Sequence, residues 1–461
     1  MGVDAARSRA KETSMKPLKA LLINPYIYDF AAYSFWSSPL GLLYVGSVLR
    51  RNGFNVELVD CMEVVEEKRK ADGRAPFVKE KVKTVPVPGQ FARRLKRYGI
   101  SGQSLMERLT QIGPPDIILI TSIMTYWYLG THEVLGIARK VFPKAKIVLG
   151  GIYPSLCREH AFRCMTAADL IVNNNEIGKF YRFVEDSTGR TLAYKPDFHN
   201  LDGLPYPCYD LAETIPFVPL LTSYGCVYRC TYCATPYMYP EITRRKADNV
   251  IGEIRYWHDR GVERYVIYDD NFLYRSDLYA KPLLRAIAGL PFSPNIYNPN
   301  AVNAALIDDE AARLLFAAGF REIRIGFESA DPAVQKTTGG KVTSRIFEAA
   351  LGALLKGGFA RDMVGVYILA GLPRQSWEDV KRSVDYLAGL GVQPHIAEYT
   401  PIPHTPLFDQ FQAAARYPIA EDPFYQNNAL FPFAWEGFTE KDLAFLKGYI
   451  RAKKTMPGNL L

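Results

Sequence analysis

Short apolar strands alternate with amphipathic helices along most of this chain, and that alternation constrains the fold more than any other feature. In the first 200 residues the expected strands cover residues 19–25, 55–60, 116–121, 146–149 and 170–172. The first strand is followed by a helix expected over residues 40–50, which Asn52 and Gly53 stop. Strands that alternate with helices form a parallel sheet with helices on both faces. The sequence therefore predicts an α/β fold that begins with a doubly wound parallel sheet.

A second series of the same kind begins at Val218. Its expected strands cover residues 218–224, 264–268, 295–298, 322–327, 363–369 and 395–400, and its helices residues 248–260, 277–288, 308–318, 344–356 and 376–390. Six such units suit a partial (β/α)₆ barrel, in which functional residues gather at the carboxyl ends of the strands. We expect five parts: a flexible N-terminus (1–18), the first domain (19–200), a linker (201–217), the barrel (218–412) and a C-terminal region (413–461).

Three cysteines follow the first expected barrel strand. Cys226, Cys230 and Cys233 have the spacing C-x-x-x-C-x-x-C. Thiolates are favoured ligands of iron–sulfur clusters, and three on one loop can hold three corners of a [4Fe-4S] cube and leave the fourth iron open. The alternatives are a zinc site or buried free cysteines. A zinc site would require a fourth Cys or His close by in the sequence. The next histidine is His258, so zinc is less favoured than a cluster.

Polar residues stand where the barrel strands are expected to end. The second strand runs into Asp269, Asp270 and Asn271, the third into the segment 298–303, and the fourth into the segment 324–329. Glu328 would be costly on an apolar inward strand unless it had a partner. For Glu328 the alternatives are a ligand or a salt bridge with Arg324 or Lys336. For Asp270 they are a ligand or an ordinary polar turn.

The expected strand ends of the first sheet are small, neutral and hydroxylic. They carry Tyr26, Thr121, Ser122, Gly150, Gly151 and Tyr153. Ligands bind such sheets at this edge, and glycines allow a large flat ligand to approach the backbone. No G-x-G-x-x-G motif opens the first helix, so a dinucleotide is not expected.

Together these motifs resemble the cobalamin-dependent radical S-adenosylmethionine (radical SAM) enzymes. The barrel part of the resemblance rests on the cysteine spacing, the Asp-Asp-Asn-Phe run at 269–272, the Gly-x-Glu-Ser run at 326–329 and the turn at 371–373. The cobalamin part rests on Pro39-Leu40-Gly41-Leu42, on Gly150-Gly151 followed by Pro154, and on the Pro-x-Pro-x-Thr-Pro-Leu run at 401–407. The resemblance covers about residues 19–412. It implies an N-terminal Rossmann-like cobalamin-binding domain followed by a partial (β/α)₆ TIM-like radical SAM barrel.

The resemblance also implies three cofactors: a [4Fe-4S] cluster on Cys226, Cys230 and Cys233, SAM, and cobalamin. The implied SAM contacts are Tyr232, which would pack on adenine, Asp270, Asn271, Asn300, Glu328, Ser329 and Gly371. The implied cobalamin contacts are Tyr26, Thr121, Ser122, Gly150, Gly151 and Tyr153. His132 lacks the D-x-H-x-x-G frame of other cobalamin proteins, so no histidine ligand to cobalt is expected. The alternative is a Rossmann-like domain that merely packs against the barrel.

The activity implied by the resemblance is reductive cleavage of SAM to a 5′-deoxyadenosyl radical and methylation of an unactivated carbon. The substrate would be a small molecule or a peptide, and the residues that act on it are not identified. An external electron donor such as flavodoxin or ferredoxin would be needed. The alternatives are a cobalamin-assisted rearrangement or cyclisation without methyl transfer, and a cobalamin-binding sensor without catalysis.

The composition of the chain limits which binding partners and which cellular compartment we expect. The net charge of +8 is moderate and spread along the chain, so no nucleic-acid partner is expected. No apolar run reaches the ~18 residues of a spanning helix, and Met1 to Lys16 lacks the apolar core of a secretory signal. Seven cysteines, an odd number, favour a reducing compartment, so a cytoplasmic location is expected. The aromatic residues of the C-terminal region are expected to pack rather than to line a pocket.

Overall fold

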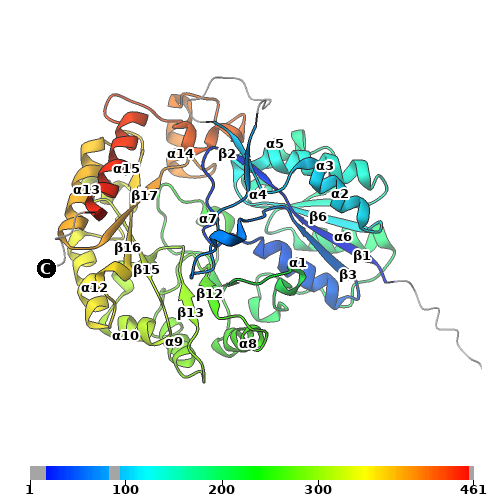
Figure 1. The fold of residues 1–461 in the computed structure, drawn as a ribbon, viewed down its shortest axis with the longest axis horizontal. Helices are drawn as coiled ribbons and strands as arrows, with labels where there is room; N and C mark the ends of the chain where they lie inside the picture. The colour runs from blue at the N-terminus through cyan, green and yellow to red at the C-terminus, as the bar shows by residue number, and fades with distance from the viewer. Residues whose placement is uncertain (1–16, 83–93, 456–461) are drawn as a thin grey trace, which may run out of the picture.

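The computed structural model describes residues 17–82 and 94–455 and contains two α/β units, which lie side by side in Figure 1. Among the described residues, the first unit has a five-stranded parallel sheet in the order β3-β1-β6-β7-β8. Its strands are β1 (Lys19–Asn24), β3 (Asn55–Asp60), β6 (Ile117–Ser122), β7 (Lys146–Gly151) and β8 (Leu170–Ile171). The predicted doubly wound sheet is confirmed. The expected flexible N-terminus falls almost entirely on residues 1–16, outside the described residues.

Helices cover both faces of this sheet. They are α1 (Leu40–Arg51), α2 (Gly102–Gln111), α3 (Tyr128–Val141), α4 (Ile152–Leu156), α5 (Arg158–Cys164) and α6 (Ile177–Thr188). Along β1 the buried side chains alternate between two hydrophobic clusters, Ala20 and Leu22 on one side and Leu21 and Ile23 on the other. A strand buried on both faces reads as a continuous apolar run, which is why the sequence revealed it. A small antiparallel sheet, β2 (Ile27–Asp29), β5 (Lys96–Tyr98) and β4 (Lys79–Lys81), was not predicted.

The second unit is an open barrel of parallel strands. The strands are β9 (Val218–Leu220), β12 (Arg264–Ile267), β13 (Asn295–Tyr297), β14 (Val302–Asn303), β15 (Ile323–Glu328), β16 (Val364–Ala370) and β17 (Gln393–Glu398). They form two ladders, β13-β12-β9 and β14-β15-β16-β17, which a single parallel bridge between Ile296 and Phe320 connects. The helices are α8 (Ala247–His258), α9 (Ala280–Ala288), α10 (Asp309–Ala317), α12 (Ser344–Lys356) and α13 (Trp377–Gly389). The predicted partial (β/α)₆ barrel is confirmed.

The first barrel strand is shorter than expected. The predicted segment 218–224 divides into β9 and β10 (Ser223–Tyr224), and β10 pairs with β11 (Thr243–Arg244) in an antiparallel ladder. The strand is interrupted near Thr222, which lies between β9 and β10. The backbone N–H of Thr222 donates to the Asp269 carboxylate at 2.7 Å instead of to a neighbouring strand. The chain therefore turns away from the barrel just before the cysteines.

The C-terminal region packs against both units. Phe424, Phe431 and Phe433 are buried, as expected, and α15 (Glu440–Thr455) lies beside α13 (Figure 1). The buried Asp29 of β2 accepts hydrogen bonds from the Trp127 indole at 2.7 Å and from the Asn427 amide at 3.0 Å. This carboxylate ties the C-terminal region to the first unit. None of the helices in the described residues has the length and apolar character needed to cross a membrane.

A loop of the first unit enters the barrel. Trp36 is fully buried and stacks on Tyr297 of β13, with ring centroids 5.1 Å apart. Its indole N–H donates to the Asp72 carbonyl at 2.8 Å, and the Arg74 guanidinium lies 4.0 Å from its ring. Trp36 also packs with Val266, whose neighbours on β12 face the helices. The interior face of β12 and β13 is therefore filled by residues of the first unit.

We predict that Trp36→Ala lowers the free energy of unfolding by about 3 to 5 kcal/mol, because a large buried ring is replaced by a cavity. Chemical denaturation followed by tryptophan-independent circular dichroism measures this change. The neighbouring Phe35 is 40% exposed, so Phe35→Ala is the matched control and should cost less than about 1 kcal/mol. Equal effects of the two substitutions would show that Trp36 does not anchor the loop in the barrel.

Candidate active site

The three cysteines lie on the loop between β10 and α7 (Thr235–Met238). Cys230 is buried, Cys226 and Cys233 are half-buried, and all three are free thiols. Gly225 starts the loop with a φ of +87°, and a Cβ there would lie 2.4 Å from the Glu241 carbonyl oxygen. Glycine is required at this position both for its conformation and for the close approach of the backbone. The loop thus leaves β10 in a direction that no other residue would permit.

Asp270, at the carboxyl end of β12, fastens both ends of the cysteine loop. Its carboxylate accepts from the backbone N–H of Gly225 at 2.8 Å and from the hydroxyl of Thr235 at 3.2 Å. The neighbouring Asp269 accepts from the hydroxyls of Thr222 and Ser223 at 2.5 and 2.6 Å. Burial raises the pKa of both carboxyl groups, and the hydrogen bonds oppose that rise. These contacts give Asp270 a role in positioning the loop that the sequence did not indicate.

The donor set suits an iron–sulfur cluster. In the described part of the chain, no three His, Cys, Asp or Glu side chains are arranged to hold a single metal ion. A [4Fe-4S] cluster makes a different demand, because each cysteine binds its own iron at a separate corner. Polar groups also reach the thiols: the Asn271 amide lies 3.6 Å from Cys226 Sγ, and the Thr235 hydroxyl lies 3.3 Å from Cys233 Sγ. Hydrogen bonds to the ligand sulfurs of a cluster tune its reduction potential.

Glu328 has a partner that the sequence analysis did not identify. Its Oε1 atom lies 2.8 Å from the Lys341 ammonium and accepts from the Tyr232 hydroxyl at 2.7 Å. Arg324, one expected partner, pairs with Glu322 instead. Burial is the largest single influence on Lys341 and disfavours its charged form, but Glu328, Cys230 and Cys233 together leave the pKa of Lys341 above its usual value. Lys341 follows Gly339 and Gly340, a flexible pair that gave no hint of a site.

This group of three side chains lies against the cysteine loop. A Cβ at Gly339 would stand 3.2 Å from Cys230 Sγ, so the segment before Lys341 touches the thiol. Tyr232 is itself on the loop, and burial together with the Glu328 carboxylate raises its pKa well above the usual value. Glu328 has a φ of +68°, a conformation that is uncommon for a residue with a Cβ and that occurs most often at functional sites.

The remaining expected SAM contacts are Asn300, Ser329 and Gly371, and each has a different environment. The Asn300 side chain is exposed and donates to the carbonyl of Tyr268 at 2.9 Å, so it borders the end of β12. Ser329 is buried, and its hydroxyl accepts from the Asp331 backbone at 3.0 Å and lies 3.4 Å from the hydroxyl of Ser383 on α13. Gly371 follows β16 with a φ of +89°. Its N–H is held by the Gln375 side chain at 2.9 Å.

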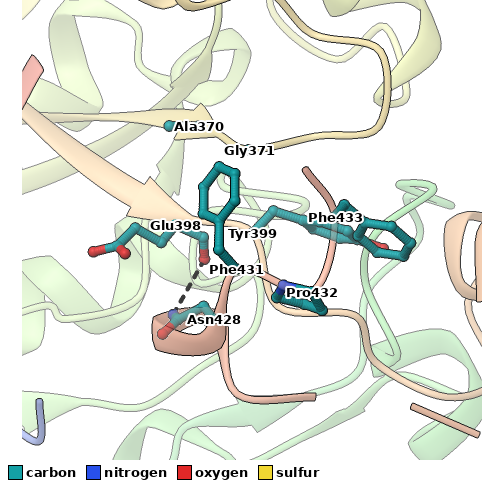
Figure 2. A pocket seen from close by; sticks show the side chains of 8 residues that line it. All are labelled: Ala370, Gly371, Glu398, Tyr399, Asn428, Phe431, Pro432 and Phe433. Atoms are coloured by element: carbon teal, nitrogen blue, oxygen red, sulfur yellow. Dashed lines mark hydrogen bonds between the residues drawn. The ribbon is translucent and has the colours of Figure 1, made fainter. Parts of the chain in front are cut away.

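Gly371 borders a small pocket at the carboxyl ends of β16 and β17, shown in Figure 2. The C-terminal region supplies the far wall, with the Phe431 ring facing Gly371 and with Phe433 beside Tyr399. A Cβ at Gly371 would lie 3.8 Å from the Phe431 ring. C-terminal aromatic residues therefore stand at the mouth of the barrel, and the expectation that they pack rather than line a pocket is wrong for Phe431 and Phe433.

The corresponding edge of the first sheet assembles four of its six expected residues. Thr121 and Ser122 end β6 directly beside Gly150 and Gly151 of β7. Gly151 has a φ of +107°, and a Cβ there would lie 2.5 Å from the Ser122 carbonyl oxygen. The Ser122 hydroxyl is buried without a hydrogen-bond partner in the described structure. An unsatisfied hydroxyl beside a strand-end glycine fits a bound polar ligand at this edge.

The two tyrosines expected at this edge lie in the core. Tyr26 and Tyr153 are fully buried, and the Tyr153 hydroxyl is 2.7 Å from His160 Nδ1. Burial lowers the pKa of His160 to about 4, so its ring is neutral at pH 7. His132 is exposed on α3. The described structure therefore brings neither His132 nor His160 to the strand ends as a free imidazole.

Residues 220–387 match the family profile described as the radical SAM superfamily. These residues form a radical SAM domain. The radical SAM domain contains the cysteine loop, Asp270 and Glu328, and the predicted resemblance of this part of the chain to radical SAM enzymes is confirmed.

Two curated relatives are methyltransferases by name. The chain is 23% identical to the cytidylyl-2-hydroxyethylphosphonate methyltransferase of Streptomyces wedmorensis, covering 84% of this chain and 80% of that protein. It is 26% identical to the bacteriochlorophyllide d C-12(1)-methyltransferase of Chlorobaculum tepidum, covering 66% of this chain and 67% of that protein. Both matches extend well beyond the radical SAM domain.

The fold is also similar to that of a solved structure. The radical SAM methyltransferase TsrM from Kitasatospora setae, determined with cobalamin and a [4Fe-4S] cluster bound, superposes with a TM-score of 0.64 at 18% identity. The superposition covers 94% of this chain and 91% of TsrM. The two proteins therefore share the whole arrangement of an N-terminal α/β unit followed by a radical SAM domain.

We predict that Asp270→Ala reduces the iron that the protein retains after anaerobic reconstitution, because both ends of the cysteine loop lose their acceptor. A buried hydrogen bond to a carboxylate contributes about 1.5 to 3 kcal/mol, enough to leave much of the loop disordered. Iron per chain and absorbance near 400 nm measure the loss. The control is Asp277→Ala, on the segment between β12 and α9, because its carboxylate is 83% exposed and its partner Lys281 keeps the carboxylate of Asp308. Full iron content in Asp270→Ala would contradict this role.

A second prediction concerns the Glu328–Lys341 pair, whose side chains are 10% and 18% exposed. Lys341→Met leaves a largely buried carboxylate without its cation and should lower the free energy of unfolding by about 2 to 4 kcal/mol. The double variant Lys341→Met/Glu328→Gln should recover most of that loss. Lys336→Met removes an exposed lysine nearby and should change little. Denaturation curves that show additive losses in the double variant would mean that the two residues do not act as a pair.

Proposed function

We propose that this protein is a cobalamin-dependent radical SAM enzyme that methylates an unactivated carbon of a small-molecule or peptide substrate. The observation that carries the proposal is the loop of three free cysteines, fastened by Asp270 at the carboxyl end of β12 inside a radical SAM domain. In this proposal residues 19–200 form the cobalamin-binding domain, 201–217 a linker and 218–412 the barrel. A C-terminal region follows.

Cys226, Cys230 and Cys233 would hold a [4Fe-4S] cluster, which supplies the electron that cleaves SAM to a 5′-deoxyadenosyl radical. Asn271 donates toward Cys226 Sγ, Thr235 lies beside Cys233 Sγ, and Asp270 holds the loop. We assign SAM to the strand ends around Tyr232, Glu328, Asn300 and Gly371. In this assignment the carboxylate of Glu328, which pairs with Lys341, accepts hydrogen bonds from the cofactor.

Cobalamin is assigned to the edge formed by Thr121, Ser122, Gly150 and Gly151. The glycine pair leaves the backbone open to a large ligand, and the buried Ser122 hydroxyl lacks another partner in the described structure. This cofactor would supply the methyl group. No histidine ligand to cobalt is assigned. The named relatives methylate a phosphonate and a chlorophyllide, chemically unlike each other, so a small molecule is favoured without a narrower class.

The experiment uses the protein reconstituted anaerobically with iron, sulfide and cobalamin, then supplied with reductant and methyl-labelled SAM. The proposal requires both 5′-deoxyadenosine formation and methylation of bound cobalamin by SAM. Each of Cys226→Ala, Cys230→Ala and Cys233→Ala should abolish 5′-deoxyadenosine while leaving cobalt content unchanged. Deoxyadenosine without methylated cobalamin would favour a rearrangement. Cobalt binding without iron would favour a sensor.

We predict that Ser122→Ala raises the stability of the protein but weakens its binding of cobalamin. Removing an unsatisfied buried hydroxyl should raise the stability of the cobalamin-free protein by about 1 kcal/mol, while loss of a ligand hydrogen bond should weaken cobalamin binding about two- to tenfold. Urea denaturation and equilibrium dialysis measure the two effects. Ser47→Ala is the control, because that buried hydroxyl already donates to the Tyr206 carbonyl at 2.7 Å and its loss should destabilise. A stability loss in Ser122→Ala equal to that in Ser47→Ala would show that Ser122 serves the fold alone.

A further inference from the structure

A groove of about 630 Å³ opens beside the cysteine loop, and Cys226 forms part of its wall. The wall comes from three segments within residues 226–229, 240–244 and 274–279. Neither of the other ligand cysteines lines it. Cys230 is buried against the segment of Gly339, and Cys233 lies beside Thr235. The groove is therefore the side from which the cysteine loop meets solvent.

The wall of the groove is positively charged. It contains Arg229, Arg244 and Arg275 against a single acidic residue, Glu241. None of the three arginines forms an ion pair with a residue that the structure describes. Arg244 is held in place by the Tyr274 carbonyl at 2.7 Å. Arg229 and Arg275 are exposed and available to a partner.

Apolar side chains surround these charges. Val227 is 42% exposed and Tyr279 is 41% exposed, and Leu278, next in the chain to Tyr279, is 65% exposed. Arginine and tyrosine among exposed aliphatic groups is the composition of a protein–protein interface. A small anion would satisfy the arginines but leave the apolar side chains uncovered. A protein with an acidic surface would satisfy both.

We propose that this groove is the docking surface for an acidic one-electron carrier protein of the flavodoxin class. The inference rests on the proposed function, in which every reductive cleavage of SAM consumes one electron. That electron passes from the reduced carrier to the cluster held by the three cysteines and leaves the carrier oxidised by one electron, with no bond formed or broken in the carrier. Docking here brings the carrier next to Cys226, the ligand cysteine that lines the groove. The opposite charges steer the encounter.

Binding is tested directly with oxidised bacterial flavodoxin and the cluster-loaded protein, by calorimetry at low and high salt. The wild type should bind, and binding should weaken as salt is raised. Arg275→Glu and the double variant Arg229→Glu/Arg275→Glu should weaken it about tenfold or more. Arg313→Glu reverses an exposed arginine on α10, outside the groove, and should bind within about twofold of wild type. A wild type that does not bind, or groove variants that bind normally, would overturn the proposal.

Turnover measured with two different reductants distinguishes a docking site for the carrier from a cofactor site. With reduced flavodoxin, the groove variants should form 5′-deoxyadenosine at least about tenfold more slowly than wild type. With dithionite, which needs no docking surface, they should match wild type, and their iron content should be unchanged. Equal losses with both reductants would assign the groove to SAM or substrate instead. If the wild type is inactive even with dithionite, the proposed function fails while the binding measurement still decides the docking surface.

Discussion

The site depends on one buried carboxylate. The Asp270 carboxylate accepts hydrogen bonds from the backbone N–H of Gly225 and from the hydroxyl of Thr235. These two residues lie before and after the three cysteines. Loops that carry metal ligands are flexible unless something closes them, and here the closing group belongs to a neighbouring strand of the barrel. Placing a carboxylate in this position carries a desolvation cost, which the raised pKa of Asp270 reflects. Packing of the barrel core offsets that cost, and the buried carboxylate fixes the geometry of the thiols.

Asp269 completes this arrangement by drawing the chain out of the barrel ladder at Thr222. The two adjacent acids have distinct tasks because successive residues at a strand end point in different directions. One shortens the first strand, and the other pins the loop that follows. The same short run thus explains why the predicted strand 218–224 is interrupted and why the cysteines begin where they do.

Much of this architecture could be predicted from the sequence, since buried parallel strands such as β1 and β6 read as unbroken apolar runs. The cysteine spacing was sufficient to predict a radical SAM domain. Long-range partners could not be predicted. Lys341 follows two glycines and has no periodic pattern, so its pairing with Glu328 appears only when β15 and the segment after α11 (Pro332–Thr337) are folded together. Likewise, the C-terminal Phe431 reaches Gly371 through tertiary packing that no local pattern encodes.

The packing of Trp36 on the interior face of β12 and β13 has a consequence for how such a protein can evolve. The barrel does not complete its own interior, because an aromatic ring from the preceding unit occupies the space beside Tyr297 and Val266. A barrel separated from this unit by gene fission or recombination would carry an apolar hollow into solvent. A different cofactor-binding module in place of the N-terminal unit would therefore have to supply its own side chain to cover Tyr297 and Val266.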